Sequence, residues 1–177
     1  VTTIEEEAFK GCTGLTNITI PNSVTTIEDM AFEGCTGLTN ITIPDSVKTI
    51  QECSFYGCNL KSIKIPDGVT TIEKEAFDYC EYLEEVNIPE GITTIEDGTF
   101  RDTFQLRHVE IPENVIEIGN SAFYNCDDLI KVIIPDSVIA IGDNAFSNCS
   151  GLTHIEIPDS VTTVETAFSM CTNLTRI

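Results

Sequence analysis

The segment Leu38-Thr-Asn-Ile41-Thr-Ile43-Pro44 contains the pattern that decides the fold. Apolar residues alternate with polar ones up to Ile43, which is typical of a short strand with one buried face. Pro44 has no amide hydrogen to donate to a neighbouring strand, so the strand ends there. We therefore predict a short strand in which Ile41 and Ile43 point inward and the polar residues point outward.

The Ile-Pro pair that closes this strand recurs along the whole chain at a nearly constant interval. Only the step from Pro44 to Pro66 is one position shorter than the others. Self-similarity at a fixed period indicates a stack of identical structural units. We expect residues 1–177 to form a single solenoid domain of about eight 23-residue repeats. The pairs are Ile20-Pro21, Ile43-Pro44, Ile65-Pro66, Ile88-Pro89, Ile111-Pro112, Ile134-Pro135 and Ile157-Pro158.

One repeat alone buries too little apolar surface to offset the entropy of ordering its backbone, so neighbouring repeats must share their apolar layers. Consecutive strands should run parallel, about 4.8 Å apart, in one sheet of about seven or eight strands. In the type unit, residues 20–42, the recurrent apolar positions are Ile20, Val24, Ile27, Ala31, Phe32, Cys35, Leu38 and Ile41.

The opposite side of each coil should be extended over residues 24–27 and helical over residues 28–35. Acidic residues at the start of the second segment and Gly34 near its end favour a helix of one or two turns. Ala31, Phe32 and Cys35 would face the core.

The net charge excludes some classes of partner. The chain has 29 acidic and 9 basic residues, a formal charge of -20. Such a surface repels nucleic-acid phosphates and anionic lipid headgroups, so we expect neither partner. No apolar run reaches the roughly 20 residues that span a bilayer. Val1 lies in the middle of the repeat pattern, and we expect the chain to be a fragment of a longer one.

Seven of the eight cysteines occupy one column of the repeat. A disulfide ladder or a metal site is one interpretation of the even count. Equivalent positions in a stack keep their Cβ atoms about 5 Å apart, however, whereas a disulfide needs about 3.5 to 4.5 Å. Buried free thiols are therefore favoured, and Cys53, outside the column, should be the exposed thiol. The column contains Cys12, Cys35, Cys58, Cys80, Cys126, Cys149 and Cys171.

A nearly all-acidic column follows the prolines. Carboxylates repeated about 5 Å apart could form a calcium ladder. The favoured interpretation is a set of solvated turns, because Pro-Asp-Ser and Pro-Asp-Gly are common turn sequences. The residues are Asn22, Asp45, Asp67, Glu90, Glu113, Asp136 and Asp159.

No combination of residues indicates catalysis or a cofactor. His108 and His154 lie two repeats apart, about 10 Å, which is too far for one shared metal ion. No serine has a G-x-S-x-G context, no glycine loop fits a phosphate, and no cysteine has a histidine partner by spacing. We therefore predict that the chain is not an enzyme and holds no metal.

The pattern Leu38-x-x-Ile41-x-Ile43-Pro44-x-x-Val47-x-x-Ile50, with the segment Ala31-Phe32, Cys35 and Leu38, resembles the 23-residue leucine-rich repeat of BspA-like proteins. The same segment recurs at Ala145-Phe146, Cys149 and Leu152. The resemblance implies a right-handed solenoid with a parallel sheet on its concave face. It also implies adhesion or host recognition by a cell-surface or secreted protein. An intracellular location stays open, because free thiols do not require an oxidising compartment.

Three departures from the pattern are local. Cys58-Asn59-Leu60 is one residue short, Thr103 replaces the usual cysteine, and Val164-Glu165-Thr166-Ala167 is one residue short. None of them is expected to break the stack.

The outward strand positions are uniform in the first repeats and diverse in the middle ones, as expected of a binding surface. Ile130 and Ile133 should face solvent among charges, the composition of an interaction hot spot. We predict a protein ligand on the concave face, while an architectural spacer without a ligand is the alternative. Open apolar layers at the two ends also predict end-to-end self-association. The predicted contact residues are Lys64, Glu85, Asn87, His108, Glu110, Ile130, Lys131, Ile133, His154 and Glu156.

Overall fold

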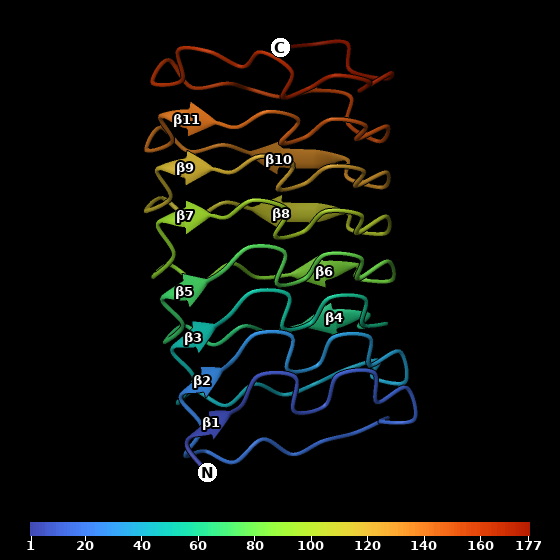
Figure 1. Ribbon diagram of the computed structural model, residues 1–177. Coiled ribbons are helices and arrows are strands. Elements are labelled where there is room, and N and C mark those ends of the chain that lie inside the picture. Colours follow the sequence, from blue (N-terminus) through green and yellow to red (C-terminus); the bar gives the residue numbers. More distant parts are fainter.

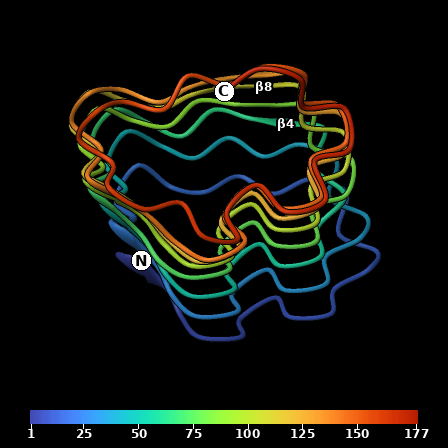
Figure 2. The same cartoon turned by 90° about the horizontal axis from the view of Figure 1, so that it is seen from above.

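The computed structural model describes all residues from Val1 to Ile177 and forms a stack of similar coils. The chain rises from one end of the stack to the other, one coil after the next (Figure 1). Viewed along the stack, the coils repeat the same outline (Figure 2). All paired strands run parallel and join neighbouring coils, so the predicted parallel-strand solenoid is confirmed.

The strands that precede the Ile-Pro pairs form a four-stranded sheet. The pairing order is β4 (Ser62–Ile63), β6 (Glu85–Val86), β8 (His108–Glu110) and β10 (Lys131–Ile133). Inward and outward side chains alternate as predicted. Before Pro44, for example, Ile41 and Ile43 are buried, whereas the polar residues beside them are exposed.

The expected sheet of seven or eight strands is too long. No backbone hydrogen bond joins residues 16–20 to residues 39–43, and one, from Lys61 N to Thr39 O at 3.0 Å, joins the second segment to the next coil. A ladder needs repeated bonds to the same neighbour, so these segments are not strands. At the other end, pairing is reduced to an isolated bridge between His154 and Arg176.

The extended segments on the other side of the coils form two further parallel sheets. The first contains β1 (Thr3–Ile4), β2 (Thr26–Ile27), β3 (Thr49–Ile50) and β5 (Thr71–Ile72). The second contains β7 (Thr94–Ile95), β9 (Glu117–Ile118) and β11 (Ala140–Ile141). β5 and β7 are not paired, and Figure 1 shows a wider step between them than between other neighbours on this side.

The helix predicted for residues 28–35 is wrong, because this segment consists of consecutive turns. Met30 has a φ of 54° and Gly34 a φ of 66°, and a right-handed helix cannot contain such left-handed residues. The same two positions are left-handed in other coils. These residues are Glu7, Cys53, Glu75, Gly98, Ser121 and Asn144 for the first position, and Gly11, Gly57, Tyr79, Asp102, Asn125, Asn148 and Met170 for the second.

Hydrogen bonds between coils explain why turns replace the helix. Phe32 N donates to Ser54 O of the next coil at 2.8 Å, whereas Cys35 N closes a turn on Phe32 O at 3.1 Å. Alternate amides thus bond to the next coil and within their own coil. Those that bond across coils are unavailable for the bonds four residues apart that a helix requires.

The predicted inward positions form one continuous core of 47 buried residues. Its centre is a column of stacked phenylalanines, with ring centroids 5.2 Å apart for Phe9 and Phe32 and 5.4 Å apart for Phe55 and Phe77. Phe146 and Phe168 also stack at 5.4 Å. The last two pairs span the short repeats, so neither missing residue breaks the stack.

Candidate partner-binding surface

The outward surface of the four-stranded sheet and of the equivalent segment in the following coil is called here the open sheet face. All ten residues predicted to contact a partner are exposed, and they lie along this side of the coils. From coil to coil they are Lys64, then Glu85 and Asn87, then His108 and Glu110, then Ile130, Lys131 and Ile133, and then His154 and Glu156.

Strand pairing brings the central residues of the open sheet face together. His108 pairs with Glu85 on one side and with Lys131 on the other. Glu110 pairs with Ile133 in the adjacent row. Charged, titratable and apolar side chains are therefore direct neighbours, although each is a whole repeat away from the next in sequence.

A groove of about 520 Å³ lies between the coils of β6 and β8. Pairing between these strands is limited to Glu85 and His108, whereas β8 and β10 share three pairs. The unpaired β5 and β7 belong to the same two coils. The backbone ladders are thus weakened on both sides of this junction, and the coils separate enough to leave the groove.

The side chain of Asn87 bonds to the backbone of the preceding coil. Its Nδ2 donates to Ile65 O at 2.8 Å, and its Oδ1 accepts from Ile65 N at 2.8 Å. Asn87 is therefore held by the preceding coil, and its side chain does not bridge to the following coil.

Acidic side chains line the groove from both coils. They are Glu85 and Glu90 of one coil and Glu110 and Glu113 of the next, beside the apolar Val86, Ile88, Ile111 and Ile133. None of the ion pairs within the chain includes any of these four glutamates. The groove combines an apolar lining with carboxylates that lack a cationic partner.

The two isoleucines predicted to face solvent do so. Ile130 is 51% exposed and Ile133 is 55% exposed. Ile133 also lines the groove, so an apolar contact point adjoins the carboxylates. Two further isoleucines that the sequence did not single out, Ile116 and Ile139, are 48% and 60% exposed. They flank β9 and β11, on the other side of the coils.

The acidic column after the prolines lies in exposed turns, as favoured by the sequence. In one of them Val47 N donates to Pro44 O at 3.0 Å, which closes the turn around Asp45. The structure has no group of three or more histidine, cysteine, aspartate or glutamate side chains that could hold a metal ion. It also contains no helix able to cross a membrane.

The cysteines are free thiols, as predicted, and six of those in the column are buried. Each buried thiol bonds to a phenylalanine carbonyl of the preceding coil, as Cys58 Sγ does to Phe32 O at 3.1 Å. Thr103 replaces one of them and donates instead to Phe100 O at 2.8 Å. The prediction for Cys53 is wrong. Cys12 is the exposed thiol, whereas Cys53 is half-buried beside Glu75, because the turn in which it lies packs on the next coil.

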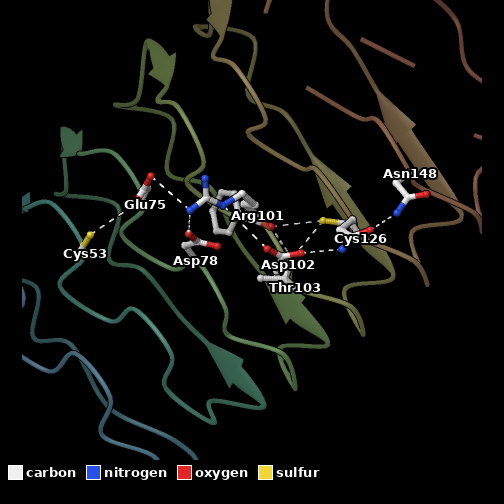
Figure 3. Close-up of polar contacts among 10 residues, drawn as sticks. Cys53, Glu75, Asp78, Arg101, Asp102, Thr103, Cys126 and Asn148 are labelled. Atoms are coloured by element: carbon white, nitrogen blue, oxygen red, sulfur yellow. Dashed lines mark hydrogen bonds and ion pairs between the residues drawn. The ribbon is translucent and has the colours of Figure 1, made fainter. Parts of the chain in front are cut away.

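An ion pair with a buried carboxylate was missed by sequence reasoning. Asp78 is fully buried among the turns and accepts a hydrogen bond from Arg101 of the next coil (Figure 3). Arg101 also lies 3.4 Å from Glu75. A signal was present in the sequence, because Asp78 and Arg101 are one repeat apart and directly follow Phe77 and Phe100.

The repeats of this chain match a known protein family. The pattern described as "BspA type Leucine rich repeat region" matches six copies, over residues 2–130 and 93–177. The chain belongs to the BspA-type leucine-rich repeat family. Solved structures show the same repeat fold. The BspA-type protein is 37% identical to a leucine-rich repeat protein from Bacteroides ovatus, with a TM-score of 0.74.

Two more solved structures resemble this BspA-type protein. The leucine-rich repeat protein of T. pallidum is 29% identical, with a TM-score of 0.75, and the match covers 78% of this chain and 68% of that protein. A leucine-rich repeat protein from Eubacterium ventriosum is 28% identical, with a TM-score of 0.78, over 88% of this chain. Among curated proteins, none matches the chain.

The BspA-type chain spans about half of its larger relatives. The match to the B. ovatus protein covers 92% of this chain and 48% of that one, and the match to the E. ventriosum protein covers 42% of that protein. The comparisons therefore establish the repeat and its fold. They concern only the part of each relative that this chain matches.

Proposed function

We propose that this BspA-type solenoid is a protein-recognition module that docks a partner on the open sheet face. The observation that carries the proposal is the exposure of Ile130 and Ile133 beside an acidic groove. Large apolar side chains ringed by polar groups are the usual anchors of protein interfaces. Core positions are constrained by packing, whereas these outward positions are free to specialise for a ligand.

Adhesion or host recognition at a cell surface is the setting that we propose for this module. Support comes from the resemblance to BspA-like proteins. The buried thiols need no oxidising compartment, so an intracellular location is compatible with the same structure. Labelling of intact source cells with an antibody against the chain tests the location, and labelling only after lysis would contradict it.

No catalytic role is part of the proposal. The groove holds glutamates, an asparagine and His108, without a serine, threonine or cysteine nucleophile among its lining residues. A recognition surface needs only exposed shape, charge and apolar area, which the open sheet face provides.

Selection from a displayed peptide library on the immobilised chain tests the recognition role. Peptides selected on the wild-type chain should lose about tenfold or more in affinity for the variant Ile130→Ser/Ile133→Ser, because an apolar anchor is removed. The matched control is Ile116→Ser/Ile139→Ser, which removes two equally exposed isoleucines from the other side of the coils.

Peptides that bind both double variants as tightly as the wild type would contradict docking on the open sheet face. Equal losses in the two variants would do the same. A selection that returns no peptide for the wild-type chain would favour the alternative, an architectural spacer.

A further inference from the structure

We propose that the groove between β6 and β8 accepts a cationic side chain, arginine above all, from a segment of the protein partner. This inference rests on the proposed function and adds the chemistry of the ligand. The groove is lined by both coils and is open to solvent on the open sheet face.

The glutamates of the groove carry charge that no cation of the chain pairs. Two glutamates from each coil line the groove, and none of them forms an ion pair within the chain. Neighbouring carboxylates repel one another, and a cation placed between them relieves that repulsion. The whole chain, with a formal charge of -20, attracts a basic segment in the same sense.

No lysine or arginine of the chain lines the groove, and His108 is the one basic side chain in its lining. Lys64 and Lys131 are exposed on this face, and neither lines the groove. Lys131 pairs with His108 on the side away from Glu85. A lysine or arginine side chain in the groove must therefore come from outside the chain.

The apolar lining favours a long side chain over a bare ion. Val86, Ile88 and Ile111 line the groove and can pack against the methylene stem of an arginine. A metal ion needs three or more ligands that converge on one point, and the structure has no such group. A planar guanidinium with several donors can instead contact carboxylates of both coils.

Ile133 extends the site beyond the charge. It lines the groove and is more than half exposed, so an apolar residue next to the arginine can pack on it. The favoured ligand is a segment in which arginine is flanked by apolar residues.

The probe is the peptide acetyl-Leu-Arg-Leu-amide, titrated into the isotopically labelled chain and followed by backbone NMR. Amide shifts should concentrate in residues 85–90 and 108–113. The citrulline peptide, which has the same shape and no charge, should bind about fivefold more weakly, since it loses a charge-assisted contact. Binding of the arginine peptide should weaken as salt is added.

The variant Glu90→Gln/Glu113→Gln tests the carboxylates. It should weaken binding of the arginine peptide about threefold, and it should weaken binding of the uncharged citrulline peptide by less. The control is Asp136→Asn/Asp159→Asn, which removes two charges from the same column of turns outside the groove. This control should keep the wild-type affinity, within about 1.5-fold.

The inference would be overturned if the arginine and citrulline peptides bound equally well. It would also be overturned if the groove variant and the control variant lost equal affinity, or if the amide shifts were scattered over the acidic surface. Its failure is distinguishable from failure of the proposed function. Library peptides whose binding depends on Ile130 and Ile133 but that contain no basic residue would support the proposed function. The same result would contradict the inference that the groove binds a cationic side chain. If peptides depend neither on Ile130 and Ile133 nor on a basic residue, both the proposed function and this inference are contradicted.

Discussion

Asp78 and Arg101 occupy the same position of adjacent coils, and Arg101 Nη2 donates a hydrogen bond to Oδ2 of the buried Asp78 (Figure 3). The other carboxylate oxygen, Oδ1, has no hydrogen-bond partner. Burial raises the pKa of Asp78 from 3.8 to about 6, which outweighs the opposite effect of Arg101. This pair lies at the junction where the coils separate to form the groove, and it holds a charge that is costly to bury.

Stability should depend on pH through Asp78. The folded chain retains the Asp78 proton up to a pH of about 6, whereas the unfolded chain releases it near 3.8. Stability therefore falls as the pH rises between these values, and the penalty is complete above them. The variant Asp78→Asn lacks this titration. Between pH ~4 and ~7 the unfolding free energy of the wild type should fall by up to about 3 kcal/mol relative to the variant.

Urea unfolding at the two pH values measures this difference. Asp45→Asn, in an exposed turn, controls for the loss of one negative charge. A wild-type stability that follows the Asp78→Asn variant in parallel across the pH range would show that the buried carboxyl does not titrate as stated.

Thiol reactivity should single out Cys12. It is the exposed cysteine, whereas burial raises the pKa of Cys58 to about 12 and, together with Glu75, that of Cys53 to about 12. A thiol reacts as the thiolate, so both should react slowly in the native chain at pH ~8. Titration with a chromogenic disulfide should show one fast thiol, lost in Cys12→Ser and kept in Cys53→Ser. A fast phase that survives in Cys12→Ser would contradict the assignment.

The phenylalanine column should make stability uneven along the stack. Phe77 is fully buried between Phe55 and Phe100, whereas Phe9 has one stacked neighbour and is half-buried. Phe77→Ala should lower the unfolding free energy by about 3 to 5 kcal/mol, as for other buried phenylalanines. Phe9→Ala should cost less than half as much. Thermal or urea unfolding of both variants is the measurement, and equal losses would argue against the column as the centre of stability.

Glycine should be favourable at the left-handed turn positions. Losing a glycine there should destabilise the chain, whereas gaining one should not. Gly57 has a φ of 64°, and an added Cβ would meet nothing within 4 Å, so Gly57→Ala isolates backbone strain. We expect it to destabilise the chain by about 1 kcal/mol. Ser121 has a φ of 53° at a position where another coil has Gly98, so Ser121→Gly should be neutral or stabilising by up to about 1 kcal/mol. Matching signs in the two variants would contradict the assigned turns.

Much of the architecture follows from particular residues of one repeat. The spacing of Ile41 and Ile43 predicts that both are buried, although their segment does not pair as a strand, and the recurrence of Phe32 predicts the core. The exposure of Ile130 and Ile133 was predicted in the same way, because their position in the repeat shows that they face outward. The binding role of that surface stays a prediction.

The features that sequence reasoning missed depend on contacts between coils. Residues 28–35 have a composition suited to a helix, but bonds such as Phe32 N to Ser54 O remove the amides that a helix would use. The position of Cys12 and Cys53 in the repeat did not reveal which thiol the next coil covers.

The sequence by itself determined the period, the inward or outward direction of the side chains before each Ile-Pro pair and the proline that ends each of these segments, because these depend on local alternation and on proline. Only the tertiary structure decided where strands pair, which turns replace a helix and where the coils of β6 and β8 separate. Those outcomes depend on hydrogen-bond partners that lie a whole repeat away along the chain. A local pattern sets what a residue can bury, whereas the distance between neighbouring coils sets which backbone groups can meet.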